Sequence, residues 1–116
     1  MISDVFCKII KGELPADIVY RDDDFLIIKD INPQAPVHLL IIPVKHYNSL
    51  EDFLEEKDLA LLGRALVAAH KVSHQVGITE KGYRLILNEG EYGGKLVPHL
   101  HIHLLGGKRL GPKIVR

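Results

Sequence analysis

The stretch that decides the fold of this chain reads Pro98-His99-Leu100-His101-Ile102-His103-Leu104-Leu105-Gly106-Gly107. Three histidines alternate in it with aliphatic residues. Successive side chains of a β-strand point to opposite faces, with about 6.6–6.8 Å between residues i and i+2. A strand over 98–105 therefore turns Leu100, Ile102 and Leu104 toward a core and lines the histidines on the other face. Because imidazole can act as a nucleophile, a proton donor or a metal ligand near neutral pH, the row indicates chemistry rather than packing.

A metal site is the main alternative interpretation of this row. Two strand histidines at i and i+2 can share a zinc ion, with nitrogen–zinc bonds of about 2.0–2.1 Å. The outer pair, His99 and His103, would lie about 13 Å apart on a regular strand. No Cys, Asp or Glu lies within the stretch to complete a site. Two histidines with ligands from elsewhere remain an alternative, but we expect neither a metal nor another cofactor to be required.

Length and charge restrict the class of protein. The 116 residues are enough for a single domain, 1–116, and the composition of 47% hydrophobic and 26% charged residues is typical of globular proteins. Fifteen basic residues balance fifteen acidic ones. A nucleic acid or an acidic membrane surface attracts a basic excess, so we expect neither as a partner. A small phosphorylated ligand held by backbone amides needs no such excess.

The single cysteine, Cys7, excludes an internal disulfide and suits a reducing compartment. We expect it to be a half-buried thiol. No basic segment followed by a long apolar run begins the chain, and aliphatic runs such as 39–42 are too short to span a bilayer. These features predict a cytoplasmic protein.

Two helices are predicted from apolar spacing and capping residues. The first spans 3–11, with Ser3 as its N-cap and Gly12 as its stop. The long helix spans 51–76 and ends before Gly77. Its apolar residues recur at about the 3.6-residue period and are Leu59, Leu62, Leu66, Ala69 and Val76.

Five strands are predicted, over 18–21, 25–30, 37–42, 83–88 and 98–105. Short connections join them, and the long helix stands between the third and the fourth. The alternating pattern of strand and helix that builds a parallel sheet is absent. The sequence therefore predicts an α+β domain with a five-stranded antiparallel sheet, one long helix and a short N-terminal helix.

Four further histidines are candidate members of a site. His38 lies inside an aliphatic strand, where an unpartnered imidazole is costly, so we expect it to support the histidine row. His46 follows a lysine just beyond that strand and is predicted to be exposed. His70 and His74 stand one helical turn apart, a spacing that can bind metal. With no third ligand near them on the helix, they are predicted to be surface residues.

The loop between the last two strands contains the pair Gly93-Gly94. Paired glycines let backbone amides approach a ligand closely and can form an anion-binding nest, although a flexible loop is an equal alternative. The loop has no Walker pattern. Histidines beside such a loop suit phosphorus chemistry: a neutral imidazole attacks phosphorus, forms a phosphoramidate, and water then cleaves it. Neighbouring imidazoles and amides would supply a proton and offset the developing charge.

The motif His99-Leu-His101-Ile-His103-Leu-Leu105 resembles that of the histidine triad (HIT) superfamily. The resemblance extends to residues 6–15, 30–38, 42–43, 82–84, 88–90, 93–94 and 105–107, which are similar to the Hint branch, the histidine triad nucleotide-binding proteins of bacterial type. It implies a homodimer whose two sheets join into one larger sheet. It also implies hydrolysis of adenosine or guanosine 5′-monophosphoramidates and related conjugates.

The resemblance also implies a role for individual residues. His101 would be the nucleophile, His103 would contact the phosphate and help to protonate the leaving group, and His99 and His38 would orient the row. Asp30 would hold the ribose hydroxyls. The remaining nucleotide-binding positions are an apolar wall around the base, formed by Phe6, Ile9, Ile28 and Ile31, and a phosphate border, formed by Asn88, Gly94, Lys95, Leu96 and Val97.

Three departures from the family pattern concern specificity. Leu96 replaces a serine that contacts the phosphate region in some members, and Pro98 replaces a frequent aromatic residue. The tail, 108–116, lacks the tryptophan-containing ending of animal relatives.

Two other functions also fit the sequence: a nucleotide-binding or protein-interaction module with vestigial catalysis, and a zinc-binding protein. An assay of turnover separates the first from an enzyme, and elemental analysis tests the second.

Overall fold

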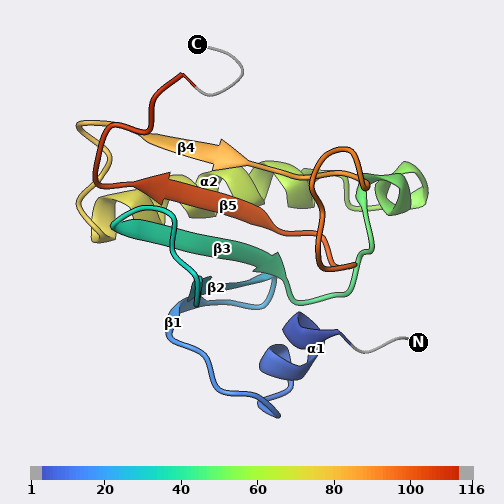
Figure 1. Ribbon diagram of the computed structural model, residues 1–116. Coiled ribbons are helices and arrows are strands. Elements are labelled where there is room, and N and C mark those ends of the chain that lie inside the picture. Colours follow the sequence, from blue (N-terminus) through green and yellow to red (C-terminus); the bar gives the residue numbers. More distant parts are fainter. Residues whose placement is uncertain (1–3, 113–116) are drawn as a thin grey trace.

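Five short strands pair into one antiparallel sheet in the computed structural model, which describes residues 4–112 (Figure 1). They are β1 (Ile18–Arg21), β2 (Phe25–Lys29), β3 (Val37–Pro43), β4 (Tyr83–Ile86) and β5 (Ile102–Gly106). The spatial order is β1-β2-β3-β5-β4, so β1 and β4 are the edges. The predicted α+β fold with five antiparallel strands is confirmed.

The short N-terminal helix predicted over 3–11 is present as α1, which spans Val5–Ile10. Its N-cap is Asp4, whose Oδ1 accepts a hydrogen bond of 2.8 Å from the amide of Cys7. The predicted cap, Ser3, lies outside the described residues. Asp4 thus satisfies one of the amides that the first turn leaves without a partner.

The long helix predicted over 51–76 is wrong as one element. A 3-10 helix, η1 (Leu50–Glu55), is followed by a separate helix, α2 (Ala60–Gln75). Glu56, which follows η1, has an extended backbone conformation and so interrupts the helical segment. Its carboxylate accepts hydrogen bonds from Lys45 Nζ and Tyr47 Oη. Gly77, at φ +76°, ends α2 as predicted.

The buried face of α2 also differs from the prediction. The residues that α2 buries are Leu61, Ala65, Ala68, Ala69, Val72 and Ser73. Leu59 and Leu66 were expected in the core but are 61% and 51% exposed. Three alanines on the buried face leave little side-chain bulk between helix and sheet. Leu61 is the one leucine on the buried face, whereas Leu66 lies on the outer side of the helix and Leu59 precedes its first residue.

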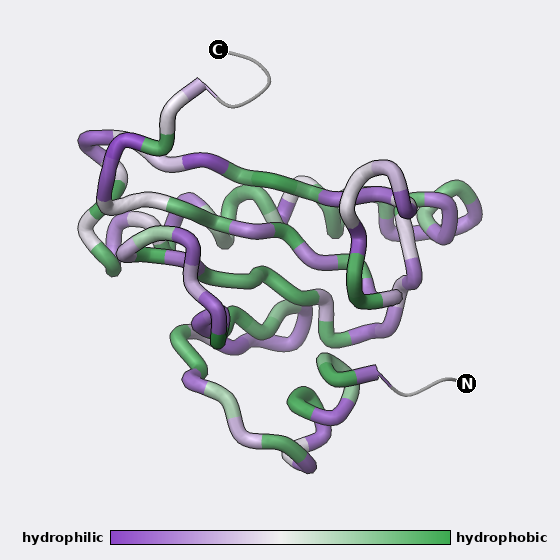
Figure 2. Tube along the Cα trace, in the orientation of Figure 1, coloured by the Kyte–Doolittle hydropathy of each residue, from purple (hydrophilic) through white to green (hydrophobic). Residues whose placement is uncertain are grey.

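Apolar clusters cover both faces of the sheet. On one face, α2 packs over residues such as Phe25, Ile27, Leu39 and Ile41; in Figure 1 this helix lies behind the sheet. On the other face, α1 contributes Phe6 to a smaller cluster with Leu26, Ile28, Leu40 and Ile42. Figure 2 accordingly shows β3 as an almost continuous hydrophobic strand, as expected when both of its faces are covered.

The histidine stretch keeps its predicted alternation but only part of its predicted strand. Leu100, Ile102 and Leu104 are 2%, 6% and 0% exposed and belong to the α2-side cluster. The strand begins only at Ile102, because the amides of His99 and Leu100 donate to Val97 and Tyr47 instead of a strand partner. None of the helices within residues 4–112 is long and apolar enough to cross a membrane.

Candidate active site

Pairing of β3 with β5 brings three histidines together on the sheet face opposite α2. Leu40 of β3 is the register partner of His103, which places His38 one step along the same face. The ring centroids of His38 and His103 are 5.2 Å apart, and those of His101 and His103 are 5.1 Å apart. We call His38, His101 and His103 the sheet-face histidines.

His101 is held in one tautomer by a backbone carbonyl. Its Nδ1 lies 2.7 Å from the carbonyl oxygen of His99. A carbonyl oxygen only accepts, so Nδ1 carries the proton and the lone pair lies on Nε2. Burial lowers the pKa of His101, which is only 8% exposed, and Phe6 packs edge-on against its ring at 5.0 Å. The ring is therefore neutral at pH 7, as a nitrogen nucleophile must be.

A chain of hydrogen bonds fixes the tautomer of His103. The amide of Gln34 donates to His38 Nδ1 at 3.0 Å, so the proton of a neutral His38 lies on Nε2. That Nε2 is 2.9 Å from His103 Nδ1. When His38 donates to His103, the proton of His103 lies on Nε2, directed away from the chain. Burial, together with the charges that His101 and His38 would carry, lowers the pKa of His103 to about 4.

Asp30 lies at the end of β2 beside the sheet-face histidines. Its Oδ2 is 3.3 Å from His38 Nε2, while Oδ1 accepts from the amide of Asn32 at 2.8 Å. The backbone amide of Asp30 donates to the carbonyl of His38. These contacts hold the carboxylate beside His38.

The predicted apolar wall is only partly assembled. Phe6 and Ile28 are buried in the α1-side cluster, and Ile9 and Val97 pack against it. Ile31, predicted as a member, is 90% exposed in the turn after Asp30. Three of the four wall residues thus share a surface next to His101.

Gly93 and Gly94 allow the backbone conformation of their own loop. A Cβ on Gly93 would lie 2.2 Å from the carbonyl oxygen of Glu89, and Gly94 has φ +82°. The amide of Gly94 donates to Glu91, and that of Lys95 donates to Gly90. Both amides are engaged within the loop, so in this structure they do not form the anion nest that was one of the two alternatives for this pair.

Residues of this loop line an open groove together with Asn48 and Ser49. Asn88 Nδ2 donates to the carbonyl of Gly93 at 2.6 Å, which braces the loop. Lys95 Nζ donates to the carbonyl of Asn48 and lies 3.8 Å from a carboxylate oxygen of Glu89. Leu96 is 93% exposed and lines the groove together with Val97.

A second cluster lies at the other end of the row, and the sequence analysis missed it. We call it the Asp4 cluster; its members are Asp4, Cys7, His46 and His99, with ligand-type atoms all within 4.8 Å of one another. His46 was predicted to be exposed, but its side chain is only 16% exposed. Asp4 and Cys7 are three residues apart at the start of a helix, so their shared side was a signal in the sequence.

His99 therefore differs from the other members of the triad. Its ring is fully buried and contacts Asp4 Oδ2 at 3.2 Å, whereas only its carbonyl reaches His101. Burial lowers the pKa of His99. Burial opposes ionisation of Asp4, but the amide of Cys7 and the nearby His99 hold the pKa of its carboxyl below the usual value.

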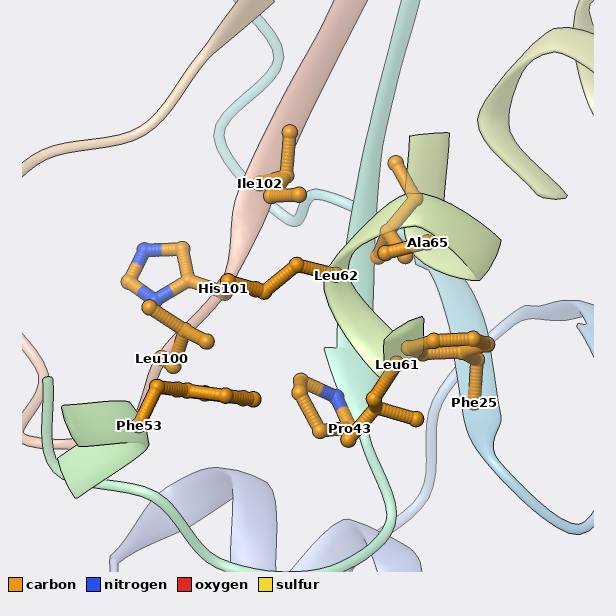
Figure 3. Close-up of a pocket in the computed structure, with 10 residues that line it drawn as sticks. Phe25, Pro43, Phe53, Leu61, Leu62, Ala65, Leu100, His101 and Ile102 are labelled. Carbon is orange, nitrogen blue, oxygen red and sulfur yellow. The ribbon is translucent and has the colours of Figure 1, made fainter. Parts of the chain in front are cut away.

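Two other features lie outside the site. A small apolar cavity between α2 and the sheet is lined by Leu61, Ala65 and Leu100; Figure 3 shows the His101 ring at its edge, pointing away from Leu62 and Pro43. His70 and His74 are exposed on α2, as predicted, and His70 Nδ1 lies 2.7 Å from the hydroxyl of Tyr83.

Known proteins are similar to this chain over nearly its whole length. The family model described as HIT domain matches residues 11–110. A purine nucleoside phosphoramidase of Escherichia coli (strain K12) is 49% identical over 110 residues, covering 95% of this chain and 92% of that protein. A solved HIT family hydrolase from Clostridium thermocellum has a TM-score of 0.92 and 51% identity, covering 99% of each chain. A histidine triad protein from Clostridium difficile has a TM-score of 0.89 and 41% identity, covering 96% of each.

Proposed function

Because this chain belongs to the HIT domain family, we propose that it is a purine nucleoside phosphoramidase. It is a hydrolase that cleaves the phosphorus–nitrogen bond of nucleoside 5′-monophosphoramidates and related conjugates, releasing the nucleoside monophosphate and an amine. The observation that carries the proposal is the hydrogen bond from His101 Nδ1 to the carbonyl of His99. It leaves an unprotonated nitrogen in a neutral ring at the end of an apolar surface.

In the first step, His101 Nε2 attacks phosphorus. A nitrogen–phosphorus bond to His101 forms while the bond to the amine breaks, which gives a nucleotidyl-histidine intermediate. The departing nitrogen takes up a proton. The hydrogen-bond chain from Gln34 through His38 supports His103 Nε2 as the nearest protein donor.

In the second step, water attacks the same phosphorus atom. The bond to His101 breaks, the nucleoside monophosphate leaves, and the His101 imidazole returns to its neutral form. The hydroxyl of the attacking water stays on phosphorus, and its other proton replaces the one that His103 gave to the amine. Dividing one displacement into two in this way is covalent catalysis. We propose that no cofactor takes part in either step.

We further propose how the nucleotide lies in the site. The base would pack on the apolar surface of Phe6, Ile9 and Ile28, with the exposed Ile31 closing over it. Asp30, fixed beside His38, would accept hydrogen bonds from the ribose hydroxyls. The phosphate border proposed here is Asn88, Gly94, Lys95, Leu96, Val97 and His103. Because the amides of Gly94 and Lys95 are engaged in the loop, the amides at 96 and 97 are the better donors.

A steady-state assay tests the proposed function. We expect the purified protein to release adenosine monophosphate from saturating adenosine 5′-phosphoramidate far above the uncatalysed rate. The competing function is a nucleotide-binding module without turnover. Tight binding of adenosine monophosphate with no product above background would favour that module and would contradict the enzyme.

A homodimer is proposed from surfaces that the single chain leaves uncovered. Within residues 4–112, β4 is an edge strand with no partner on its outer side, and edge strands are usually covered or paired. On α2, Leu66 and Val67 are 51% and 55% exposed. Arg84 Nη1, on β4, is buried without a hydrogen-bond partner within residues 4–112. A second copy that extends the sheet across β4 would cover these groups.

The mass of the protein in solution tests the dimer. We expect twice the mass of one chain at micromolar concentration, and a shift toward the single-chain mass in Val67→Asp. A single-chain mass for the wild type would contradict the proposal. A cytoplasmic location also stays a prediction, and fractionation of cells would test it.

A further inference from the structure

A second cavity lies on the α2 side of the sheet, at the end where β4 begins and β5 ends. Its volume is about 700 Å³, within the range of about 300–1,000 Å³ that small-molecule sites occupy. Two segments form it, the turn from α2 into β4 and the segment after β5, which lie together at the left end of the sheet in Figure 1. We call it the basic cavity; its lining residues are Gly77, Ile78, Lys81, Gly82, Gly107, Lys108 and Arg109.

The basic cavity is separate from the reacting histidines. Its lining residue Ile78 belongs to the α2-side cluster, whereas the sheet-face histidines lie on the opposite face of the sheet. Gly107 also follows His103 by four residues, which on a strand corresponds to about 13 Å. A ligand in the basic cavity therefore does not occupy the place of the substrate.

Three cations line the basic cavity, and no carboxylate is among its lining residues. The cations are Lys81, Lys108 and Arg109. Within residues 4–112 none of them forms an ion pair, whereas Arg64 pairs with two carboxylates. Glu80 belongs to the same turn as Lys81 but does not line the cavity. On a chain without net charge, this is a local positive excess that attracts anions.

The C-terminal end of α2, beside the cavity, is capped by hydrogen bonds. A helix C-terminus carries partial negative charge on carbonyl groups that lack partners. The amides of Val76, Gly77 and Ile78 donate to three carbonyls in the last turn of α2. These bonds reduce the partial charge that would oppose an anion at this end of the helix.

The remaining lining of the basic cavity is apolar side chain and bare backbone. Ile78 is 5% exposed and packs closely on Gly106, where a Cβ would lie 2.8 Å from Ile78 Cδ1. Gly77 and Gly82 are exposed with φ of +76° and +104°, and a Cβ on either would meet no atom within 4 Å. A flat or bulky group can therefore approach the backbone between the cations.

We propose that the basic cavity binds a small molecule that carries two or more linked phosphate groups. Three cations on two segments match a ligand with several negative charges. Arg109 can hold a phosphate through two parallel hydrogen bonds, while Lys81 and Lys108 act as point charges. Bare oligophosphates and nucleoside polyphosphates share this chemistry, and a nucleoside would lie against Ile78 and the glycine backbone. Binding would join the turn before β4 to the segment after β5.

Titration with tripolyphosphate, followed by amide NMR, tests the site. We expect the amide signals of Gly77, Gly82 and Gly107 to shift with a common Kd of about 0.1 mM at low salt. The affinity should fall by about tenfold at about 0.3 M salt, because salt screens exposed charges. The melting temperature should rise by about 5 °C at ten times the Kd. Adenosine triphosphate that shifts the same signals at lower concentration would identify the ligand as a nucleoside polyphosphate, and equal affinity would identify the phosphate chain alone.

A triple variant and a matched control complete the test. The cavity variant combines Lys81→Gln, Lys108→Gln and Arg109→Gln. We expect it to weaken tripolyphosphate binding by about 10²-fold, at about fivefold for each cation. Its hydrolysis of adenosine 5′-phosphoramidate should stay at the wild-type rate, so this site and the proposed function are tested independently. The control removes three exposed cations elsewhere, through Lys8→Gln, Lys11→Gln and Lys57→Gln, and should keep the wild-type Kd.

Two results would overturn the proposal. One is equal affinity of the cavity variant and the control for tripolyphosphate, because the cations of the cavity would then have no special part in binding. The other is the absence of shifts at the three glycines at millimolar tripolyphosphate. Shifts confined to Gly93 and Gly94 are one form of that second result and would assign the anion to the phosphate border instead.

Discussion

The Asp4 cluster and the sheet-face histidines both contain imidazoles, but their hydrogen bonds direct the ring nitrogens differently. Each contains imidazoles beside one carboxylate, and a single residue separates His99 from His101. In the Asp4 cluster, the outer nitrogens are bonded to carbonyl oxygens and the lone pairs face inward. In the sheet-face histidines, hydrogen bonds end on Nδ1 of His101 and of His103, so their Nε2 atoms face outward. Hydrogen-bond partners, rather than residue type, therefore decide which histidines can react.

The largest effect should follow from removing the nucleophile. We expect His101→Ala to lower kcat by at least about 10³-fold with adenosine 5′-phosphoramidate, because no other described side chain presents a neutral nitrogen in its place. Nucleotide binding should stay at the wild-type level. The matched control is His70→Ala, an exposed histidine that should keep full activity. Near-normal turnover of His101→Ala would show that His101 is not the nucleophile and that the sheet-face histidines are not the reactive group.

A smaller effect should follow at the end of the hydrogen-bond chain. We expect His103→Ala to lower kcat by about 10²-fold for substrates with a basic alkylamine leaving group, since such a group needs a proton to depart. The loss should be smaller for an aryl ester of the same nucleotide. Equal losses on the two substrates would show that His103 acts on binding rather than on the leaving group.

Acid should destabilise the protein through His103. Its folded pKa of about 4 lies below the ordinary value of 6.5, so the unfolded chain binds more protons between these two pH values. The free energy of unfolding should be unaffected by this group above pH 6.5. It should fall as the pH is lowered toward 4, by on the order of 1 kcal/mol after solvent screening. Urea unfolding across this range should give a shallower slope for His103→Gln; identical slopes would contradict the lowered pKa.

The smallest expected effect concerns Leu96 at the rim of the groove. A serine there could donate a hydrogen bond that leucine cannot, worth about 0.5–1.5 kcal/mol. We expect Leu96→Ser to raise turnover of alkylamine substrates by up to about tenfold and to change aryl ester hydrolysis little. Comparison of the two substrates in wild type and variant measures this directly. The same rate change on both would show that residue 96 does not act on the leaving group.

The sheet and its histidine row were predictable because period-two alternation has one physical meaning in a strand. Leu100, Ile102 and Leu104 reach the predicted core, and His38 joins the row as expected. The long helix was less predictable, since the break at Glu56 depends on Lys45 and Tyr47, which come from another part of the chain.

The division within the row could not be predicted from spacing. His99 and His101 look alike in sequence, and their different roles follow from long-range partners such as Asp4 and Pro43. His46 was assigned to the surface because local sequence gives no sign of its contact with Cys7, 39 residues away. The glycine pair suggested a ligand nest. In the structure, position 93 needs glycine because a Cβ there would clash with the carbonyl oxygen of Glu89 in the same loop.

The stereochemical course at phosphorus tests the nucleophilic role of His101 most directly. Each in-line displacement inverts the configuration at phosphorus, so attack by His101 followed by attack of water gives two inversions. With a chiral sulfur-substituted nucleoside phosphoramidate in heavy-oxygen water, the account predicts a nucleoside phosphorothioate of retained configuration. Inverted product would mean that water attacks phosphorus directly and would contradict the nucleotidyl-histidine intermediate.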